Sequence, residues 1–188
     1  MNIVVRPYGS KGCYCRPDTT WERENRDFYV PEGIEEVRWA PVVFVRVSKA
    51  GKCVGAKFAE RYYDSFNFGV LLYCVGQDGE SSVAFTSCAD HSSILPSPLN
   101  KLELMETEEN IYQVSRNAEE VFSCNCMNIK QMLEETLCTA SKLTTLRIGD
   151  YVAVELLPAG TLATCKDADT RLHSRFCEKD LYNFKIVY

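Results

Sequence analysis

The residues best suited to chemistry in this chain of 188 residues are its ten cysteines and two histidines. Cys88, Asp90 and His91 lie close together in "SCADHSS", and a thiol, an imidazole and a carboxylate can form a nucleophilic catalytic set. Adjacent residues of an extended segment point in opposite directions, however, so Asp90 is poorly placed to orient His91. We therefore interpret His91 as a histidine of a surface loop. His173, in the charged segment "TRLHSRF", is expected to be exposed.

Two close pairs of cysteines, Cys13/Cys15 and Cys124/Cys126, could contribute to a metal site. Zinc sites usually space their cysteines by two to four residues, so the C-x-C spacing is a weak indication. Both members of such a pair face the same way on a strand, which allows a site of four thiolates. The alternative is that these are buried or edge-strand thiols, kept reduced inside the cell.

Charge and hydropathy exclude several classes of protein. The chain has 21 basic and 26 acidic residues, a net charge of −5, and no basic run, so a nucleic acid is not expected as a partner. No apolar run approaches the ~20 residues of a membrane-spanning helix. The first residues, "MNIVVRPYGS", lack the pattern of a signal peptide. A cytoplasmic protein is therefore predicted, with no membrane association.

Short runs of β-branched and aromatic residues, bounded by turn signals, dominate the sequence. Such runs predict strands over 2–7, 28–31, 39–47, around Val54, 69–76, 81–87, 110–125 as a hairpin, 149–157 and 181–188. The segment "QDGE" (77–80) is read as a turn. A proline, Pro41, lies inside the most apolar run, where it removes a ladder hydrogen bond.

Two helices are predicted between these strands. "GAKFAERYYDSF" (55–66) has aromatic residues spaced by four, and "NIKQMLEETLCTASKL" (128–143) begins with a capping-box-like Asn128 and continues as an amphipathic stripe. We find no phosphate-binding loop, G-x-G-x-x-G motif or nucleophile elbow. The prediction is a single α+β domain over 1–188, rich in β structure, with two packed helices.

The order of these pieces resembles the fumarylacetoacetate hydrolase family, in particular its short bacterial acylpyruvate hydrolases and 2-oxo-acid hydratases. The resemblance lies in "CYCRPDTTW", in the long stretch from "FYVPEGIEEV" to "GVLLYCV", and in "RNAEEVFSCNCMNIKQMLEETLCTASKLTTLRIGDYV". It implies a mixed β-sandwich roll that is commonly dimeric, so a homodimer is expected. Arg16 and Asp18 match positions that the family keeps, although a structural salt bridge or a turn cap would explain them equally well.

The resemblance also implies a metal site, and this sequence departs from it. In the family, a Glu-x-Glu pair on one strand and an aspartate on the next bind magnesium or manganese, which holds the 2-oxo-acid substrate. The matching positions here are Ala40, Val42 and Leu71. Hydrocarbon side chains cannot ligate a hard cation, which requires oxygen ligands. We therefore expect no metal cofactor, and a small apolar pocket lined by these three residues.

Further features of the family's active site are depleted. The resemblance implies that the family's helical segment with the catalytic histidine is deleted near residues 8–13. Ser87 lies where the family has a basic residue, and Leu157 replaces a threonine in "ELLPAG". With His91, these two are the other candidate pocket residues.

These departures lead to the prediction of a degenerate, catalytically inactive family member that binds a small ligand or a partner protein. The alternative is an active metal-dependent hydrolase, decarboxylase or hydratase of acylpyruvate-type 2-oxo acids. Such an enzyme would have to recruit other ligands, and the nearest donors are Glu35 and Glu36.

Overall fold

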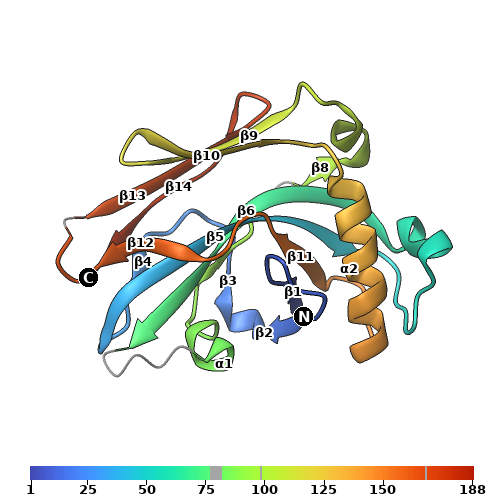
Figure 1. Cartoon of the computed structure of the whole chain (residues 1–188), viewed down its shortest axis with the longest axis horizontal. Helices are drawn as coiled ribbons and strands as arrows, with labels where there is room; N and C mark the ends of the chain where they lie inside the picture. Colours follow the sequence, from blue (N-terminus) through green and yellow to red (C-terminus); the bar gives the residue numbers. More distant parts are fainter. Residues whose placement is uncertain (77–81, 98, 168) are drawn as a thin grey trace.

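The computed structural model describes residues 1–76, 82–97, 99–167 and 169–188, which form two sheets packed face to face (Figure 1). The first sheet has the order β2-β1-β11-β5-β6-β7-β3, with β12 paired to β5 and β8 paired to β6. Its strands are β1 (Ile3–Arg6), β2 (Tyr14–Arg16), β3 (Trp21–Glu22), β5 (Ile34–Val47), β6 (Tyr63–Gly76), β7 (Ser93–Ile94), β8 (Asn100–Lys101), β11 (Tyr151–Glu155) and β12 (Gly160–Thr164).

The second sheet has the order β10-β9-β13-β14-β4 and lies above β5 and β6 in the view of Figure 1. Its strands are β4 (Phe28–Tyr29), β9 (Ile111–Arg116), β10 (Glu119–Asn125), β13 (Thr170–Phe176) and β14 (Lys179–Val187). The helical segments are α1 (Val83–Thr86), α2 (Ile129–Leu143) and three 3-10 turns, η1 (Asp18–Thr20), η2 (Ala56–Tyr62) and η3 (Leu102–Glu106). The predicted β-rich α+β class is confirmed. No helix in the described ranges is long and apolar enough to cross a membrane.

The main core lies between the two sheets, and α2 closes one end of it (Figure 1). Phe68 of β6 stacks on Tyr112 of β9 with 4.4 Å between ring centroids, and it also contacts Phe176 of β13. Leu133 and Leu137 of α2 are fully buried against this cluster. Burial of such side chains contributes about 1.5–3 kcal/mol each, which explains why the predicted amphipathic stripe of 128–143 folds as a helix.

The opposite face of the first sheet curls on itself and encloses a second, smaller core. Trp21 of β3, at one end of the strand order, packs on Tyr151 of β11 with 5.4 Å between ring centroids. The Arg16 guanidinium of β2, at the other end, donates to the carbonyl of Leu72 on β6 at 2.6 Å. Contacts between strands that are distant in the sheet order show that this sheet closes into a roll.

Pro41 occupies a position of β5 where no ladder hydrogen bond is lost. On that side of β5, strand β11 pairs up to Val42 and β12 pairs from Trp39, so the partner changes at the proline. The Pro41 carbonyl still accepts from the Leu156 amide at 2.8 Å. A residue of an antiparallel strand directs its N–H and C=O to the same side, so the missing N–H faces the gap between β11 and β12.

Several predicted elements are wrong in detail. The segment 81–87 was predicted as a strand, but α1 forms there with the Ser82 hydroxyl as its N-cap, a role for which serine is well suited. The predicted helix 55–66 is the 3-10 turn η2 only, because from Tyr63 the chain pairs with β5. No strand forms around Val54, which is buried in the loop before η2. The predicted turn 77–80 lies outside the described residues.

Candidate functional site

Ala40, Val42 and Leu71 lie side by side on the inner face of the roll, and we call them the apolar patch. Ala40 is directly paired with Leu71 across β5 and β6, and Val42 lies two residues along β5 on the same face. All three side chains are 0% exposed, so they fill the core, and none of them lines the cavity described next. They pack in the second core with Ile3, Val5, Phe44, Tyr73, Leu95, Tyr151 and Ala153.

The apolar patch does not fit a divalent metal ion. Its three side chains present only carbon, whereas magnesium and manganese need oxygen ligands. Within the described ranges, moreover, no group of three or more His, Cys, Asp and Glu residues could hold a metal ion. Glu35 and Glu36, the donors nearest in sequence, are the second and third residues of β5, and Glu36 forms a salt bridge with Arg38.

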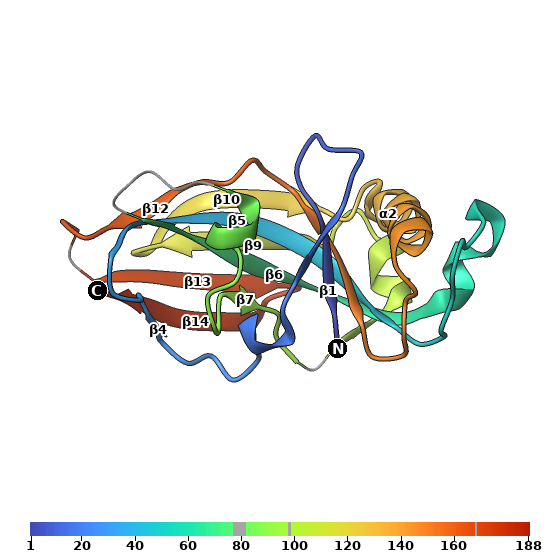
Figure 2. The same ribbon diagram turned by 90° about the horizontal axis from the view of Figure 1, so that it is seen from below.

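A cavity of about 190 Å³ opens on the same face of the sheet, beside the apolar patch. Alternation along the strands places its residues: Arg38 precedes Ala40 by two positions, and Tyr73 follows Leu71 by two. The helix α1, which lies across β6 in Figure 2, forms another wall. The lining residues are Pro7, Tyr14, Arg38, Tyr73, Val75, Val83, Thr86, Glu155 and Ala159.

Glu155, at the end of β11, is the buried acid of this cavity, with only 5% of its surface exposed. One carboxylate oxygen accepts from the Tyr8 amide at 2.9 Å, and the other accepts from the Tyr73 hydroxyl. The Tyr73 hydroxyl lies 2.7 Å from the Tyr14 hydroxyl. We call this cavity, with Tyr14, Tyr73 and Glu155 as its polar groups, the acidic pocket.

Arg16 lies behind the acidic pocket and is 1% exposed. Its guanidinium carbon lies 5.0 Å from the centroid of the Tyr73 ring. It donates through Nε to the Ser87 carbonyl at 2.9 Å and through Nη2 to the Ser92 hydroxyl at 2.9 Å, while Nη1 has no hydrogen-bond partner. A buried cation is costly unless an anion compensates it, and Glu155 is the acid whose ionisation it favours.

Burial dominates the ionisation of these groups. It raises the pKa of Glu155, although the hydrogen bonds from Tyr73 and Tyr8 and the charge of Arg16 act in the opposite direction. Burial raises the pKa of Tyr14 to about 12. The pKa of Tyr73 is also raised, by burial first and then by neighbouring Tyr14 and Glu155. Both tyrosines therefore keep their hydroxyl protons at neutral pH.

The other predicted pocket residues lie near the acidic pocket but do not line it. Ser87, which is 2% exposed, directs its hydroxyl back to the Val83 carbonyl and uses its own carbonyl to hold Arg16. Leu157 is half-buried in the turn between β11 and β12, and Ala159 of the same turn lines the pocket.

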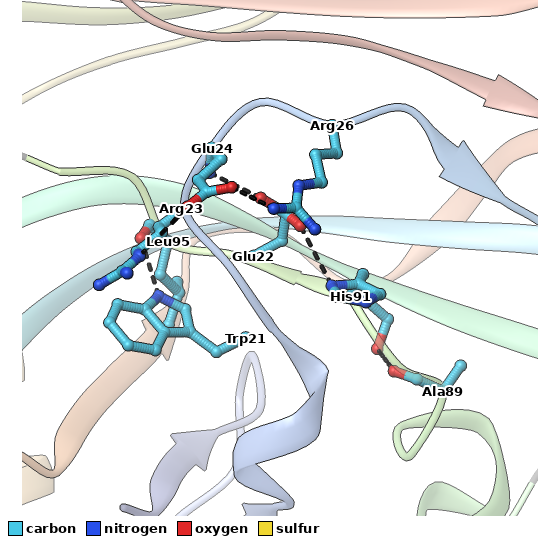
Figure 3. Close-up of polar contacts among 9 residues, drawn as sticks. Trp21, Glu22, Arg23, Glu24, Arg26, Ala89, His91 and Leu95 are labelled. Carbon is cyan, nitrogen blue, oxygen red and sulfur yellow. Dashed lines mark hydrogen bonds and ion pairs between the residues drawn. The ribbon is translucent and has the colours of Figure 1, made fainter.

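His91 lies at an exposed turn, with a φ of 59°, and its partner is a residue that sequence reasoning missed. Figure 3 shows the His91 ring beside Glu22, whose carboxylate lies 3.1 Å from Nδ1 and is only 4% exposed. The imidazole is thus oriented by Glu22 and not by Asp90. The nearby Cys88 thiol is exposed and contacts the Phe85 carbonyl. Neither Glu22 nor His91 lines the acidic pocket.

The remaining candidates are separated in the structure. Cys13 and Cys15 belong to the β2 region of the first sheet, whereas Cys124 and Cys126 are at the end of β10 in the second. His173 was predicted in an exposed charged tail, but it lies in β13, half-buried and 3.0 Å from Asp180. That reading was wrong because the neighbours of His173 alternate between buried and exposed, as they do in a strand.

Glu155 is the residue of the candidate site that the sequence could have indicated. It is the one acid in "YVAVELL", a run that is otherwise apolar or aromatic, and alternation places it on the same face as Tyr151 and Ala153. A charged residue at a buried position of a strand is unusual and signals a partner. Its side-chain partner Tyr73, and Tyr14, which bonds to Tyr73, come from other strands and carry no signal of their own.

No protein-family model matches the chain, and no curated protein sequence matches it. Solved structures do match. Maleylpyruvate hydrolase from Sphingobium sp. SYK-6 has a TM-score of 0.76 and 14% identity, covering 99% of this chain and 70% of that chain. Fumarylpyruvate hydrolase from Pseudomonas aeruginosa, crystallised with Mn2+ and pyruvate, has a TM-score of 0.73 and 13% identity, covering 99% of this chain and 96% of that chain.

A candidate member of the fumarylacetoacetate hydrolase family from Yersinia pestis CO92 has a TM-score of 0.73 and 15% identity, covering 99% of this chain and 92% of that chain. At such identities the likeness establishes the three-dimensional arrangement and not the chemistry. The chain has the fold of fumarylacetoacetate hydrolase family proteins, the fold that its sequence predicts.

Proposed function

We propose that this protein is a degenerate fumarylacetoacetate hydrolase family member. It has lost metal-dependent catalysis and binds a small organic molecule in the acidic pocket. The observation that carries the proposal is the apolar patch. Ala40, Val42 and Leu71 are all 0% exposed and all hydrocarbon, at the positions where the resemblance places the carboxylates. Three simultaneous losses leave nothing at those positions to polarise a 2-oxo acid.

The acidic pocket supports the ligand-binding half of the proposal. It is a concave site with mostly apolar walls and a few converging polar groups, which is the usual form of a small-molecule site. It lies next to the patch on the same face of the roll, so the fold retains a hollow there after the loss of the carboxylates.

Metal analysis combined with an activity assay tests the proposal. The protein is purified in the presence of manganese and magnesium, its bound metal is measured by mass spectrometry, and cleavage of acylpyruvates is followed. Fumarylpyruvate hydrolase from P. aeruginosa serves as the positive control. We expect far less than one divalent ion per chain and no turnover. One manganese or magnesium per chain with turnover would show that the alternative, a metal-dependent enzyme on 2-oxo acids, is correct.

A further inference from the structure

The hydrogen bonds of the acidic pocket run in one direction. With Glu155 ionised, its carboxylate can only accept, so the Tyr73 hydroxyl donates its single hydrogen to it. The Tyr14 hydroxyl must then donate to Tyr73 across their 2.7 Å contact. Thr86 donates its hydroxyl hydrogen to the Ser82 carbonyl at 3.1 Å.

The polar oxygens of the cavity wall are therefore left with lone pairs and no hydrogens. Each Glu155 oxygen has one donor and can accept another, and the oxygens of Tyr14 and Thr86 can accept as well. A ligand that completes these hydrogen bonds must itself carry donors. A group with several hydrogens, such as an ammonium, fits this requirement better than a carboxylate or a carbonyl.

The charges around the cavity favour the same kind of ligand. Arg38, at the edge, is already paired with both oxygens of Glu36, at 3.0 Å each. Arg16 lies behind the Tyr73 ring and is not part of the cavity wall. Within the described residues, two charged side chains line the cavity, Arg38 and Glu155, and the charge of Arg38 is paired with Glu36. The carboxylate of Glu155 therefore sets the charge preference inside the cavity, where it repels an anion and attracts a cation.

The remaining walls fit an apolar body. Pro7, Val75 and Val83 contribute hydrocarbon, and the Tyr14 and Tyr73 side chains contribute aromatic rings. Aromatic rings also attract cations. The volume of about 190 Å³ exceeds the ~150 Å³ of an engineered cavity that holds benzene. One ring with a short side chain can be accommodated.

From this arrangement we infer that the ligand of the acidic pocket is a small organic amine, with its ammonium group on Glu155 and its apolar body against Tyr14, Tyr73 and Val83. The inference rests on the proposed function and assigns the chemical class of its ligand. It reverses the charge preference expected of a site for 2-oxo acids.

Three probes of similar shape test the inference: benzylamine, benzyl alcohol and benzoate. Each is titrated into the 15N-labelled full chain at neutral pH, and binding is followed by amide chemical shifts. We expect benzylamine to bind most tightly, with shifts at Tyr8, Val75 and Thr86, and benzoate to bind at least about ten-fold more weakly.

The Glu155→Gln variant keeps the size of the side chain and removes its charge, so it should bind benzylamine about ten-fold more weakly than the wild type. Glu120→Gln makes the same change on the second sheet and should leave binding unchanged.

The possible results separate the inference from the proposed function. If benzoate or benzyl alcohol binds at these residues as tightly as benzylamine, the assignment to amines is wrong, while metal-free ligand binding stands. If benzylamine binds equally to the wild type and to a folded Glu155→Gln variant, Glu155 does not recognise it and the inference fails. If none of the probes shifts the pocket amides, the inference fails together with the ligand-binding half of the proposal.

Discussion

The apolar patch and the acidic pocket occupy the same face of one sheet, two residues apart along the strands. The patch contains no polar side chain, whereas the pocket contains a buried carboxylate. The patch presents only hydrocarbon and is fully buried. The pocket keeps a carboxylate that is nearly as buried, with a hydrogen bond on each oxygen and a guanidinium behind it.

The difference shows what a buried charge requires in this fold. An ionised carboxylate in the core is very costly unless it is hydrogen-bonded and compensated. Three carboxylates brought together in a core would need a metal ion to compensate their charge, whereas a patch of hydrocarbon needs no compensation. A single carboxylate can be compensated by the protein alone, and Arg16, Tyr73 and the Tyr8 amide compensate Glu155.

The largest effect is expected from Arg16→Met. This change removes the compensating charge of Glu155 and three donated hydrogen bonds, so we expect the free energy of unfolding to fall by about 3–5 kcal/mol. Urea denaturation followed by circular dichroism measures it. Adding Glu155→Gln should recover part of the loss. If the double variant is no more stable than Arg16→Met, Arg16 does not compensate Glu155.

In the apolar patch, Leu71→Ala should cost about 2–5 kcal/mol, because a fully buried leucine leaves a cavity when it is truncated. The same denaturation experiment measures the loss. The exposed Leu143, at the end of α2, provides the matched control, since Leu143→Ala should change stability by less than about 0.5 kcal/mol. Equal effects of the two changes would mean that the patch is not tightly packed.

The two regions also differ in how well their residues could be predicted from the sequence. Alternation along β5 and β6 correctly places Ala40, Val42 and Leu71 on one face, because a strand has a fixed period of two. The acidic pocket could not be found in this way. Tyr14, Tyr73 and Glu155 come from β2, β6 and β11, and their contact depends on the curl of the sheet, which no local pattern encodes.

The secondary-structure predictions are wrong where the local conformational preference of a segment competes with capping or with strand pairing. The segment 83–86 has β-forming residues, but Ser82 caps a helical turn there. The aromatic residues of 55–66 match a helical period, yet Phe66 is buried in β6, where strand pairing outweighs local propensity.

A smaller loss is expected from Tyr73→Phe, which keeps the ring on Arg16 and removes only the hydroxyl. Hydrogen bonds to charged groups contribute about 1.5–3 kcal/mol, so the free energy of unfolding at neutral pH should fall by that amount. Tyr14→Phe removes a bond between two neutral hydroxyls and should cost about 0.5–1.5 kcal/mol. If Tyr14→Phe costs as much as Tyr73→Phe, the direction assigned to the chain of hydrogen bonds is wrong.

The raised pKa of Glu155 makes stability depend on pH. The folded protein binds more protons than the unfolded chain between the ordinary glutamate pKa, about 4.3, and the higher folded-state value. The stabilisation from protonated Glu155 is therefore complete below about pH 4 and is lost as the pH rises through the folded-state pKa. Relative to Glu155→Gln, the wild type should become less stable over this window. Denaturation of both proteins between pH 3.5 and 7 measures the difference, and parallel curves would contradict the raised pKa.

The smallest effect is expected at the edge of the pocket, where Arg38 and Glu36 form a salt bridge with side chains that are 42% and 21% exposed. Solvent screens such a pair, so its removal by Arg38→Met should cost no more than about 1 kcal/mol. Glu36 accepts hydrogen bonds from Nε and Nη2 of Arg38 and so pairs its charge at the rim of the pocket. Glu36→Gln would weaken that pairing, and we expect benzoate to bind more tightly to this variant than to the wild type, with stability almost unchanged. Unchanged benzoate affinity would mean that Glu155 alone sets the charge preference of the pocket, which would make the contrast between the pocket and the patch depend on a single carboxylate.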